Sequence, residues 1–259
     1  LIEQERQGGI YLTVLGFGMG NYHDDTMEIL ADKGNGNYAY IDSLLEAKKV
    51  LVKELSGTLF ALANDVKIQV EFNQARVGAY RLIGYENRAL ADEDFRDDAK
   101  DAGEVGVGHR VTALYELIPA GHAAIPELDP LKYQARKTAP PSGANELMTV
   151  KLRYKPQGEQ RSQQMSLAVS GVTKEPSVDF RFAAAVAGYG MLLSRSEHLG
   201  DFNWEPCLAM ARAGRGRDAE GYRAEFYRLV EESELLARRL VQGPHDAHAP
   251  EPAPQPMLR

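Results

Sequence analysis

The stretch "DAGEVGVGHRVTALYELIP", residues 101–119, contains the residue types of a catalytic loop, because three glycines lead to His109 beside a glutamate and aspartates. A histidine acting as general base needs a nucleophile or a substrate pocket within hydrogen-bond reach, and usually an orienting carboxylate. The sequence around His109 offers no Gly-x-Ser-x-Gly elbow, no reactive cysteine context and no second histidine at ligand spacing. We therefore interpret His109 as a structural turn histidine.

The glycines before His109, at positions 103, 106 and 108, match neither the Gly-x-Gly-x-x-Gly nor the P-loop pattern. They precede an expected strand, whereas a phosphate-binding loop precedes a helix. We expect them to allow a positive φ or a close backbone approach at a turn or bulge.

The acidic run "ADEDFRDDAKD", residues 91–101, is a second candidate, this time for a metal ion. A calcium loop of the EF-hand type needs a glycine at its sixth position, so that its oxygens converge. This run lacks that glycine, and Arg96 and Lys100 offset its charge. We expect a solvated loop between two strands with Phe95 turned inward; a weak site for a cation or a basic partner is the alternative.

The other potential ligands are scattered. Cys207 is the only cysteine, which excludes an internal disulfide and a cysteine zinc cluster, and we expect it to be a small buried residue on a helix. His122 and His198 are isolated in the sequence. His245 and His248 lie in the proline-rich stretch 243–259, which has the composition of a disordered tail.

Composition sets the class of protein. The chain has 259 residues, of which 44% are hydrophobic and 26% charged, as in soluble globular proteins. Its formal net charge of -7 argues against nucleic acid or anionic lipid as a general partner. The longest nearly apolar stretch, 183–193, is far shorter than the roughly 20 residues that cross a bilayer.

The first part of the chain alternates strand and helix. "IYLTVLGFG", residues 10–18, reads as a strand buried on both faces, and a helix follows from Asp24 or Asp25 to Gly34. A short strand in "NGNYAYID" precedes a helix that starts at Ser43 with capping-box spacing to Glu46 and runs to about Leu55. This order is typical of a doubly wound parallel sheet.

After residue 57 the hydrophobic pattern changes to period two. "DVKIQVEFN" places Val66, Ile68, Val70 and Phe72 on one face, with Lys67, Gln69 and Glu71 on a wet face. Four further strands are predicted in "VGAYRLIGYEN", "HRVTALYELI", "LMTVKLRYKP" and "QQMSLAVS", with a long exposed loop over 120–146. Together they indicate an antiparallel sandwich or a partial barrel.

Helices return after Pro176, in "DFRFAAAVAGYGMLLSRS", "NWEPCLAMARA" and "AEGYRAEFYRLVEESELLARRL". The last has an apolar stripe, which we expect to pack on the sandwich: Tyr222, Phe226, Leu229, Leu236 and Leu240. The predicted class is α+β: a partial doubly wound α/β part over 1–56, then a β-sandwich-like domain with C-terminal helices over 57–242, then the tail 243–259.

These segments also carry a family resemblance. "YLTVLGFGMGNYHDDTMEILADKGNGNYAYIDSLLEAKKVLVKEL" resembles the closing third of a bacterial von Willebrand factor type A domain. "DVKIQVEFNQARVGAYRLIGYENRALADEDFRDDAKDAGEVGVGHRVTALYELIP" is similar to the domain that follows it in the YfbK-like family, as are "FAAAVAGYGMLL" and "GYRAEFYRLV".

The resemblance implies a metal-dependent adhesion function. In such a domain an Asp-x-Ser-x-Ser loop, a Thr and a later Asp hold Mg²⁺, which leaves one position for a partner's carboxylate. Hard oxygen ligands of this kind suit that ion. This chain contains no Asp-x-Ser-x-Ser, so we predict no metal site within it, while Mg²⁺ is expected for an intact type A domain.

The resemblance also locates a contact site. The loop "GFGMGN", residues 16–21, would lie on the metal-bearing edge of the sheet as a rim contact, and we nominate Asn21, Tyr22 and His23 as partner contacts. The partner would be a protein. The resemblance further implies the bacterial cell envelope or periplasm, although the sequence starts at Leu1 with no leader that could be read.

Three functional readings follow. We favour a non-enzymatic interaction module whose metal-dependent site belongs to a segment before residue 1. The second reading is a structural scaffold of the cell envelope, and the third is an enzyme that uses His109. Because "YLTVLGF" would leave apolar faces uncovered, we also expect self-association through an exposed sheet edge, or a partly molten 1–56.

Overall fold

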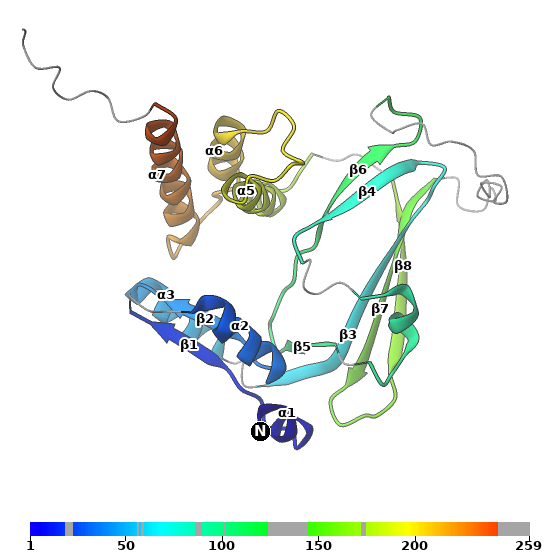
Figure 1. Cartoon of the computed structure of the whole chain (residues 1–259). Helices are drawn as coiled ribbons and strands as arrows, with labels where there is room; N and C mark the ends of the chain where they lie inside the picture. The colour runs from blue at the N-terminus through cyan, green and yellow to red at the C-terminus, as the bar shows by residue number, and fades with distance from the viewer. Residues whose placement is uncertain are drawn as a thin grey trace, which may run out of the picture. The chain divides into compact units, whose positions relative to one another are not determined.

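The computed structural model describes residues 1–18, 23–55, 57, 60–85, 90–100, 102–123, 145–171 and 175–242. The chain divides into two compact units, residues 1–172 and 173–259. The first contains all the strands and the second is helical (Figure 1). The predicted α+β class, with antiparallel sheets and C-terminal helices, is confirmed.

The first unit begins with a small parallel sheet. Helix α1 (Ile2–Gln7) precedes strand β1 (Val14–Phe17), and helix α2 (Asp24–Lys33) leads to strand β2 (Tyr38–Ile41). The two strands pair in parallel from Val14 opposite Tyr38 to Phe17 opposite Ile41. This is a βαβ unit, as the alternation of apolar and helical segments predicts.

The following helix begins where its sequence predicts. Ser43 is its N-cap, and its hydroxyl oxygen accepts a hydrogen bond from the backbone N–H of Glu46 at 3.2 Å. The helix is regular only over α3 (Leu44–Lys48) and continues as a π-helical segment, η1 (Lys49–Lys53). Val50, in this segment, is buried.

A four-stranded antiparallel sheet, in the order β5-β3-β7-β8, forms the centre of the first unit. Figure 1 shows β3, β7 and β8 running side by side. The strands are β3 (Ala61–Phe72), β5 (Gly103–Gly106), β7 (Glu146–Pro156) and β8 (Gln163–Ser170). A separate antiparallel pair is formed by β4 (Val77–Ile83) and β6 (Leu114–Pro119).

Cross-strand partners in an antiparallel sheet point to the same face, so the register assigns the side chains to faces. One face carries three apolar rows across β3, β7 and β8: Ile68–Leu152–Met165, Val70–Val150–Leu167 and Phe72–Met148–Val169. These nine residues are called the apolar face below. The opposite, polar face carries the rows Lys67–Arg153–Gln164, Gln69–Lys151–Ser166 and Glu71–Thr149–Ala168.

Only one end of the apolar face is covered. Phe72 is buried because its ring lies 4.5 Å from that of Tyr80 on β4 and 5.3 Å from that of Tyr115 on β6, between centroids. At the other end Ile68 is 53% exposed. The prediction that Ile68 lies on a buried face is therefore wrong, because the covering strand pair does not extend that far.

The prediction of a wet Lys67 is also wrong, because this side chain is only 2% exposed. The cause lies in the chain on its polar face, where the 3₁₀-helix η3 (Asp92–Arg96) packs against β3. Strand β3 is irregular just before Lys67: its register against β7 shifts between Asn64 and Lys67, and Asp65 has φ 49°. These are the features of a β-bulge.

The second unit consists of helices α5 (Val178–Leu193), α6 (Trp204–Ala213) and α7 (Tyr222–Gln242). Phe226 of α7 packs edge-on against Phe182 and Tyr189 of α5, with ring centroids 5.2 and 5.5 Å apart. Its core is small, and Ala185, Cys207, Ala211 and Val230 are fully buried in it. The expected burial of Cys207 is confirmed.

The predicted apolar stripe of α7 is only partly buried. Leu229, Leu236 and Leu240 are exposed, whereas Val230, outside the predicted stripe, is completely buried. Within the helical unit, the stripe is therefore only partly covered, and its packing on the strands stays a prediction. Helix α7 shares contacts with α6 along one side and with the aromatic rings of α5 near its start, which selects a different set of its residues.

Candidate functional site

The nominated contact residues follow the carboxyl end of β1. Asn21 and Tyr22 lie outside the described residues, and His23 is an exposed N-cap of α2 without a side-chain capping bond. Strand β2 holds both ends of this loop. The Tyr40 hydroxyl donates to the carbonyl oxygen of Gly18 at 2.5 Å, and the Tyr38 hydroxyl donates to the carboxylate of Asp24.

This edge of the sheet presents carboxylates but no convergent set. Asp24 and Asp25 occupy the first turn of α2, where a helix N-terminus favours negative charge, and Asp42 follows β2. Across the part of the chain that the structure describes, no group of three or more His, Cys, Asp or Glu side chains could hold a metal ion.

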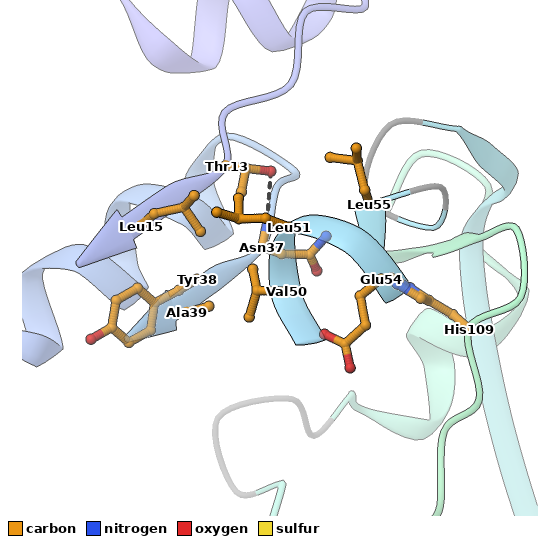
Figure 2. A pocket seen from close by; sticks show the side chains of 10 residues that line it. All are labelled: Thr13, Leu15, Asn37, Tyr38, Ala39, Val50, Leu51, Glu54, Leu55 and His109. Carbon is orange, nitrogen blue, oxygen red and sulfur yellow. Dashed lines mark hydrogen bonds between the residues drawn. The ribbon is translucent and has the colours of Figure 1, made fainter. Parts of the chain in front are cut away.

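His109 lies in a turn at the rim of a cavity of about 190 Å³ in the first unit (Figure 2). Its backbone N–H donates to the carbonyl oxygen of Gly106 at 3.1 Å. Its ring packs on Gly57 so closely that a Cβ there would lie 2.3 Å from the imidazole Cδ2. Substituting any larger residue for Gly57 would displace His109.

The cavity itself is mostly apolar. Leu15, Val50 and Leu51 contribute to its wall, and Figure 2 shows Glu54 and His109 together at one side. Among the described residues no hydrogen bond joins the His109 ring to Glu54. Thr13 offers a hydroxyl that accepts from the backbone N–H of Asn37 at 3.4 Å. The geometry fits a histidine that packs in a turn.

The glycines before His109 behave in part as predicted. Gly108 has φ 82°, which favours glycine, and a Cβ at Gly106 would lie 1.7 Å from the carbonyl oxygen of Gly57. Their placement is different from the prediction, because Gly103 and Gly106 belong to strand β5, which the sequence analysis did not predict. Pairing with β3 fixes them, rather than the turn alone.

The acidic segment 92–100 is held by cations of the sheet. Lys67 donates from Nζ to the backbone carbonyl oxygens of Asp94, at 3.2 Å, and of Asp97. Arg153 donates to the Asp98 carboxylate at 2.8 Å, and Lys155 donates to the Asp98 carbonyl oxygen at 2.9 Å. The expected inward position of Phe95 is confirmed, since it is 5% exposed.

Asp98 is the centre of this network. The Ser162 hydroxyl donates to its carboxylate at 2.7 Å. This bond, and next the bond from Arg153, lower the pKa of Asp98 from 3.8 to about 2. The basic partner of the acidic segment is therefore in the same chain. Asp101 lies outside the described residues.

Of the remaining histidines, the structure describes His122 and His198, and neither belongs to a group that could hold a metal ion. His122 follows β6 in a turn, and His198 is half exposed with its Nε2 3.5 Å from Glu197. His245 and His248, with the tail 243–259, lie outside the described residues, as does most of the predicted loop 120–146. None of the helices in the described ranges is long and apolar enough to cross a membrane.

Comparison with known protein families identifies most of this chain. Residues 57–236 match the family model described as "Uncharacterized protein YfbK, C-terminal", which is more than half of the chain. The chain belongs to this YfbK C-terminal family. The matched range starts at Gly57, against which His109 packs, and ends within α7.

The relative "Uncharacterized protein YfbK" of Escherichia coli (strain K12) is 43% identical over 233 residues. The alignment covers 89% of this chain, so the likeness extends beyond the range of the family model. It covers 40% of the relative. The chain therefore spans less than half the length of the curated YfbK protein that it matches.

Proposed function

We propose that the chain is a non-enzymatic, adhesion-type protein-interaction module, in which residues 1–56 form the closing part of a von Willebrand factor type A domain. The observation that carries the proposal is the βαβ unit β1-α2-β2. All-parallel sheets are covered on both faces and contain more strands than two. This unit is therefore completed by strands outside the part that the structure describes.

The exposed side chains of the βαβ unit support this reading. Phe17 at the end of β1 is 61% exposed, and Ile29 on α2 and Leu44 on α3 are exposed as well. Apolar side chains distributed around a small parallel sheet are the surfaces that further strands and helices cover. The greater length of the E. coli relative is consistent with such a segment.

The contact surface would be the loop after β1. The hydroxyls of Tyr40 and Tyr38 bond to Gly18 and Asp24, the two ends of the segment that contains the nominated residues Asn21, Tyr22 and His23. A protein partner would touch these residues beside a Mg²⁺ ion. That ion would be bound by side chains that precede residue 1 and not by this chain.

The proposal is tested with the full-length E. coli YfbK protein and with this 259-residue chain, each used as bait in magnesium and in EDTA. We expect magnesium-dependent capture of a partner by the full-length relative, weakened when its residue equivalent to His23 is replaced by Ala. Magnesium titrated calorimetrically into this chain alone should give no stoichiometric binding. A fully coordinated ion held only by side chains of this chain would overturn the proposal.

The second reading is a structural scaffold of the cell envelope, favoured by the uncovered end of the apolar face at Ile68, Met165 and Leu167. It differs in one measurable way, because capture by a scaffold would be unchanged in EDTA. The third reading, an enzyme built on His109, would require that His109→Ala abolish an activity while the chain stays folded.

A further inference from the structure

Strand β8 forms one edge of the four-stranded sheet. In the order β5-β3-β7-β8 it is the last strand, and among the described residues no strand pairs with its outer side. Seven of its eight residues are exposed, all except Val169. Its sequence, "QQMSLAVS", contains neither a charge nor a proline.

Such an edge is unusual, because proteins normally protect edge strands from pairing with other chains by charges, prolines, bulges or shortness. The opposite edge of the same sheet has these protections. Strand β5 has only four residues, carries Glu104, and pairs with β3 through two register irregularities. The chain thus protects one edge and leaves the other open.

The open edge also carries exposed apolar side chains. Met165 is 55% and Leu167 66% exposed, although both belong to the apolar face. They continue the rows of Ile68 and Val70 across β7 to the outer edge of the sheet. An added strand at this edge would therefore find apolar side chains on one face and unpaired backbone groups in the plane.

The backbone directions along β8 can be assigned. The Gly171 N–H donates to the carbonyl oxygen of Asn145, on the side of β7, and successive amides in a strand point to opposite sides. The irregularity near this end lies in β7, which has the extra residue. The even-numbered amides of β8, including those of Ser166 and Ala168, therefore point to the open edge.

We propose that β8 pairs with β8 of a second copy of this chain, antiparallel and about a twofold axis at Leu167. In this register Ser166 pairs with Ala168 of the other copy, and Gln164 with Ser170, through their outward backbone groups. Leu167 lies opposite Leu167 of the other copy, and Met165 lies opposite its Val169. The apolar faces of the two copies therefore join into one continuous face. An isologous contact of this kind closes as a dimer.

A second copy of this chain suits this edge better than a charged strand does, because β8 itself is uncharged. A strand carrying Lys, Arg, Asp or Glu would find no opposite charge along residues 163–170 and would lose the hydration of its own charges. The neutral β8 strand meets neither cost when it pairs with itself. Binding of a neutral extended peptide is the competing outcome.

The inference does not depend on the proposed function, because it concerns a different sheet. Self-association through the βαβ unit would use Phe17, Ile29 or Leu44, whereas this dimer uses β8. A variant at Leu44, which is 87% exposed on α3, separates the two surfaces. Loss of magnesium-dependent capture would leave the dimer unaffected.

The first test measures the mass of the full 259-residue chain by analytical ultracentrifugation over a range of micromolar concentrations. We expect a dimer. Ser166→Pro removes one outward N–H and Leu167→Lys places a charge at the axis, so each should weaken dimerisation by at least about tenfold. Leu44→Lys should leave it unchanged, and circular dichroism verifies that each variant is folded.

The second test determines the register of the two β8 strands by disulfide cross-linking. Leu167→Cys should form an intermolecular disulfide under mild oxidation, because residues opposite each other at the axis bring their Cα atoms to about 4.5 Å. Gln163→Cys is the control, since its copies would lie roughly 27 Å apart along the strands. The wild-type chain is a second control, because Cys207 is buried.

Three results would overturn the inference. The first is a wild-type chain that remains monomeric over the whole concentration range. Binding of a synthetic peptide of residues 163–170 by a chain that stays monomeric would count as this result. The second is a dimer that Leu44→Lys disrupts and Ser166→Pro does not. The third is equal cross-linking of the Leu167→Cys and Gln163→Cys variants.

Discussion

The Nζ atom of Lys67 lies 3.2 Å from the backbone carbonyl oxygen of Asp94, and the lysine side chain is only 2% exposed. A buried ammonium group is costly unless it is hydrogen-bonded. Here it donates to the carbonyl oxygens of Asp94 and Asp97, near the end of η3, each of which also accepts one backbone N–H. Lys67 thereby fixes the acidic segment to the polar face of the sheet.

Replacing Lys67 by Met should destabilise the first unit. The substitution keeps the length of the side chain but removes the ammonium donor from the carbonyl oxygens of Asp94 and Asp97, which keep only their backbone donors. We expect a loss of about 1–3 kcal/mol in the free energy of unfolding, which urea denaturation followed by circular dichroism would measure.

The matched control for this variant is Lys151→Met on the same face of the sheet. Lys151 pairs with Glu71, whose side chain is 67% exposed, and such surface pairs contribute only about 0–1 kcal/mol. Equal destabilisation by both substitutions would contradict the role assigned to Lys67.

Removing the Ser162 hydroxyl should raise the pKa of Asp98. Its bond is the largest cause of the lowering from 3.8 to about 2, followed by the bond from Arg153. Because the folded pKa lies below the unfolded one, the stabilisation is complete above the unfolded value and is lost as pH falls towards 2. In Ser162→Ala the stabilisation should be smaller, and its loss should be complete at a higher pH.

Carboxyl ¹³C NMR titration of Asp98 in the wild-type chain and in Ser162→Ala checks this shift. Ser166→Ala, in the strand β8 that follows Ser162, is the control and should leave the Asp98 titration unchanged. An unchanged Asp98 pKa in Ser162→Ala would show that the Ser162 hydroxyl does not cause the lowering.

Two glycines of helix α5 should respond in opposite ways to alanine. At Gly188 a Cβ would lie 2.5 Å from the Phe202 ring, so Gly188→Ala should cost about 1–3 kcal/mol by overpacking. At Gly190 nothing lies within 4 Å, so Gly190→Ala should stabilise the helix by about 0.5–1 kcal/mol. Thermal unfolding of both variants provides the measurement.

A compensating change identifies the contact responsible at Gly188. Phe202→Leu removes the ring atoms that the new Cβ would meet, so it should restore part of the stability lost in Gly188→Ala. Additive effects of the two substitutions would argue against direct contact.

The thiol of Cys207 should be inert in the folded chain. It is completely buried, its Sγ donates to the Ala185 carbonyl oxygen at 3.5 Å, and burial raises its pKa to about 11. Since the thiolate is the reactive form, an aromatic disulfide reagent at neutral pH should label it only when the helical unit opens. Labelling as fast in buffer as in urea would contradict this.

The local elements of the fold follow closely from the sequence. The glycine-bounded run before Gly18 predicts β1, and the spacing of Ser43 and Glu46 predicts the N-cap that the structure shows. These features depend on neighbouring residues, which is why pattern and capping chemistry identify them. The burial of Cys207 follows in the same way from its helical context.

Burial across the sheet could not be predicted in the same way. Which face of β3 is covered, and over what length, depends on how η3 and the β4–β6 pair pack against it, which is decided by tertiary structure. The Asn64–Asp65 pair was the available signal for the irregularity, because these residues tolerate a positive φ. Strand β5 escaped prediction because its glycines have little intrinsic strand preference.

The contacts that position the candidate site could not be predicted from the sequence. The loop after β1 is fixed at its ends by tyrosines that the sequence analysis did not select, because hydroxyl partners across a βαβ unit leave no pattern in the sequence. His109 packs against Gly57, some fifty positions earlier in the chain, a contact that only tertiary structure reveals. The roles of Asn21 and Tyr22 remain predictions.

The irregularity of β3 between Asn64 and Lys67 has a consequence for how this strand tolerates change in length. Three residue steps of β3 there correspond to two of β7, because Asn64 pairs with Lys155 and Lys67 with Arg153. Deleting one residue between them would equalise the two strands, so the side chains on both sides could keep their faces while the bulge is lost. A deletion in a regular part of the strand would instead turn one half of it to the opposite face, so the bulge is the position at which β3 can shorten.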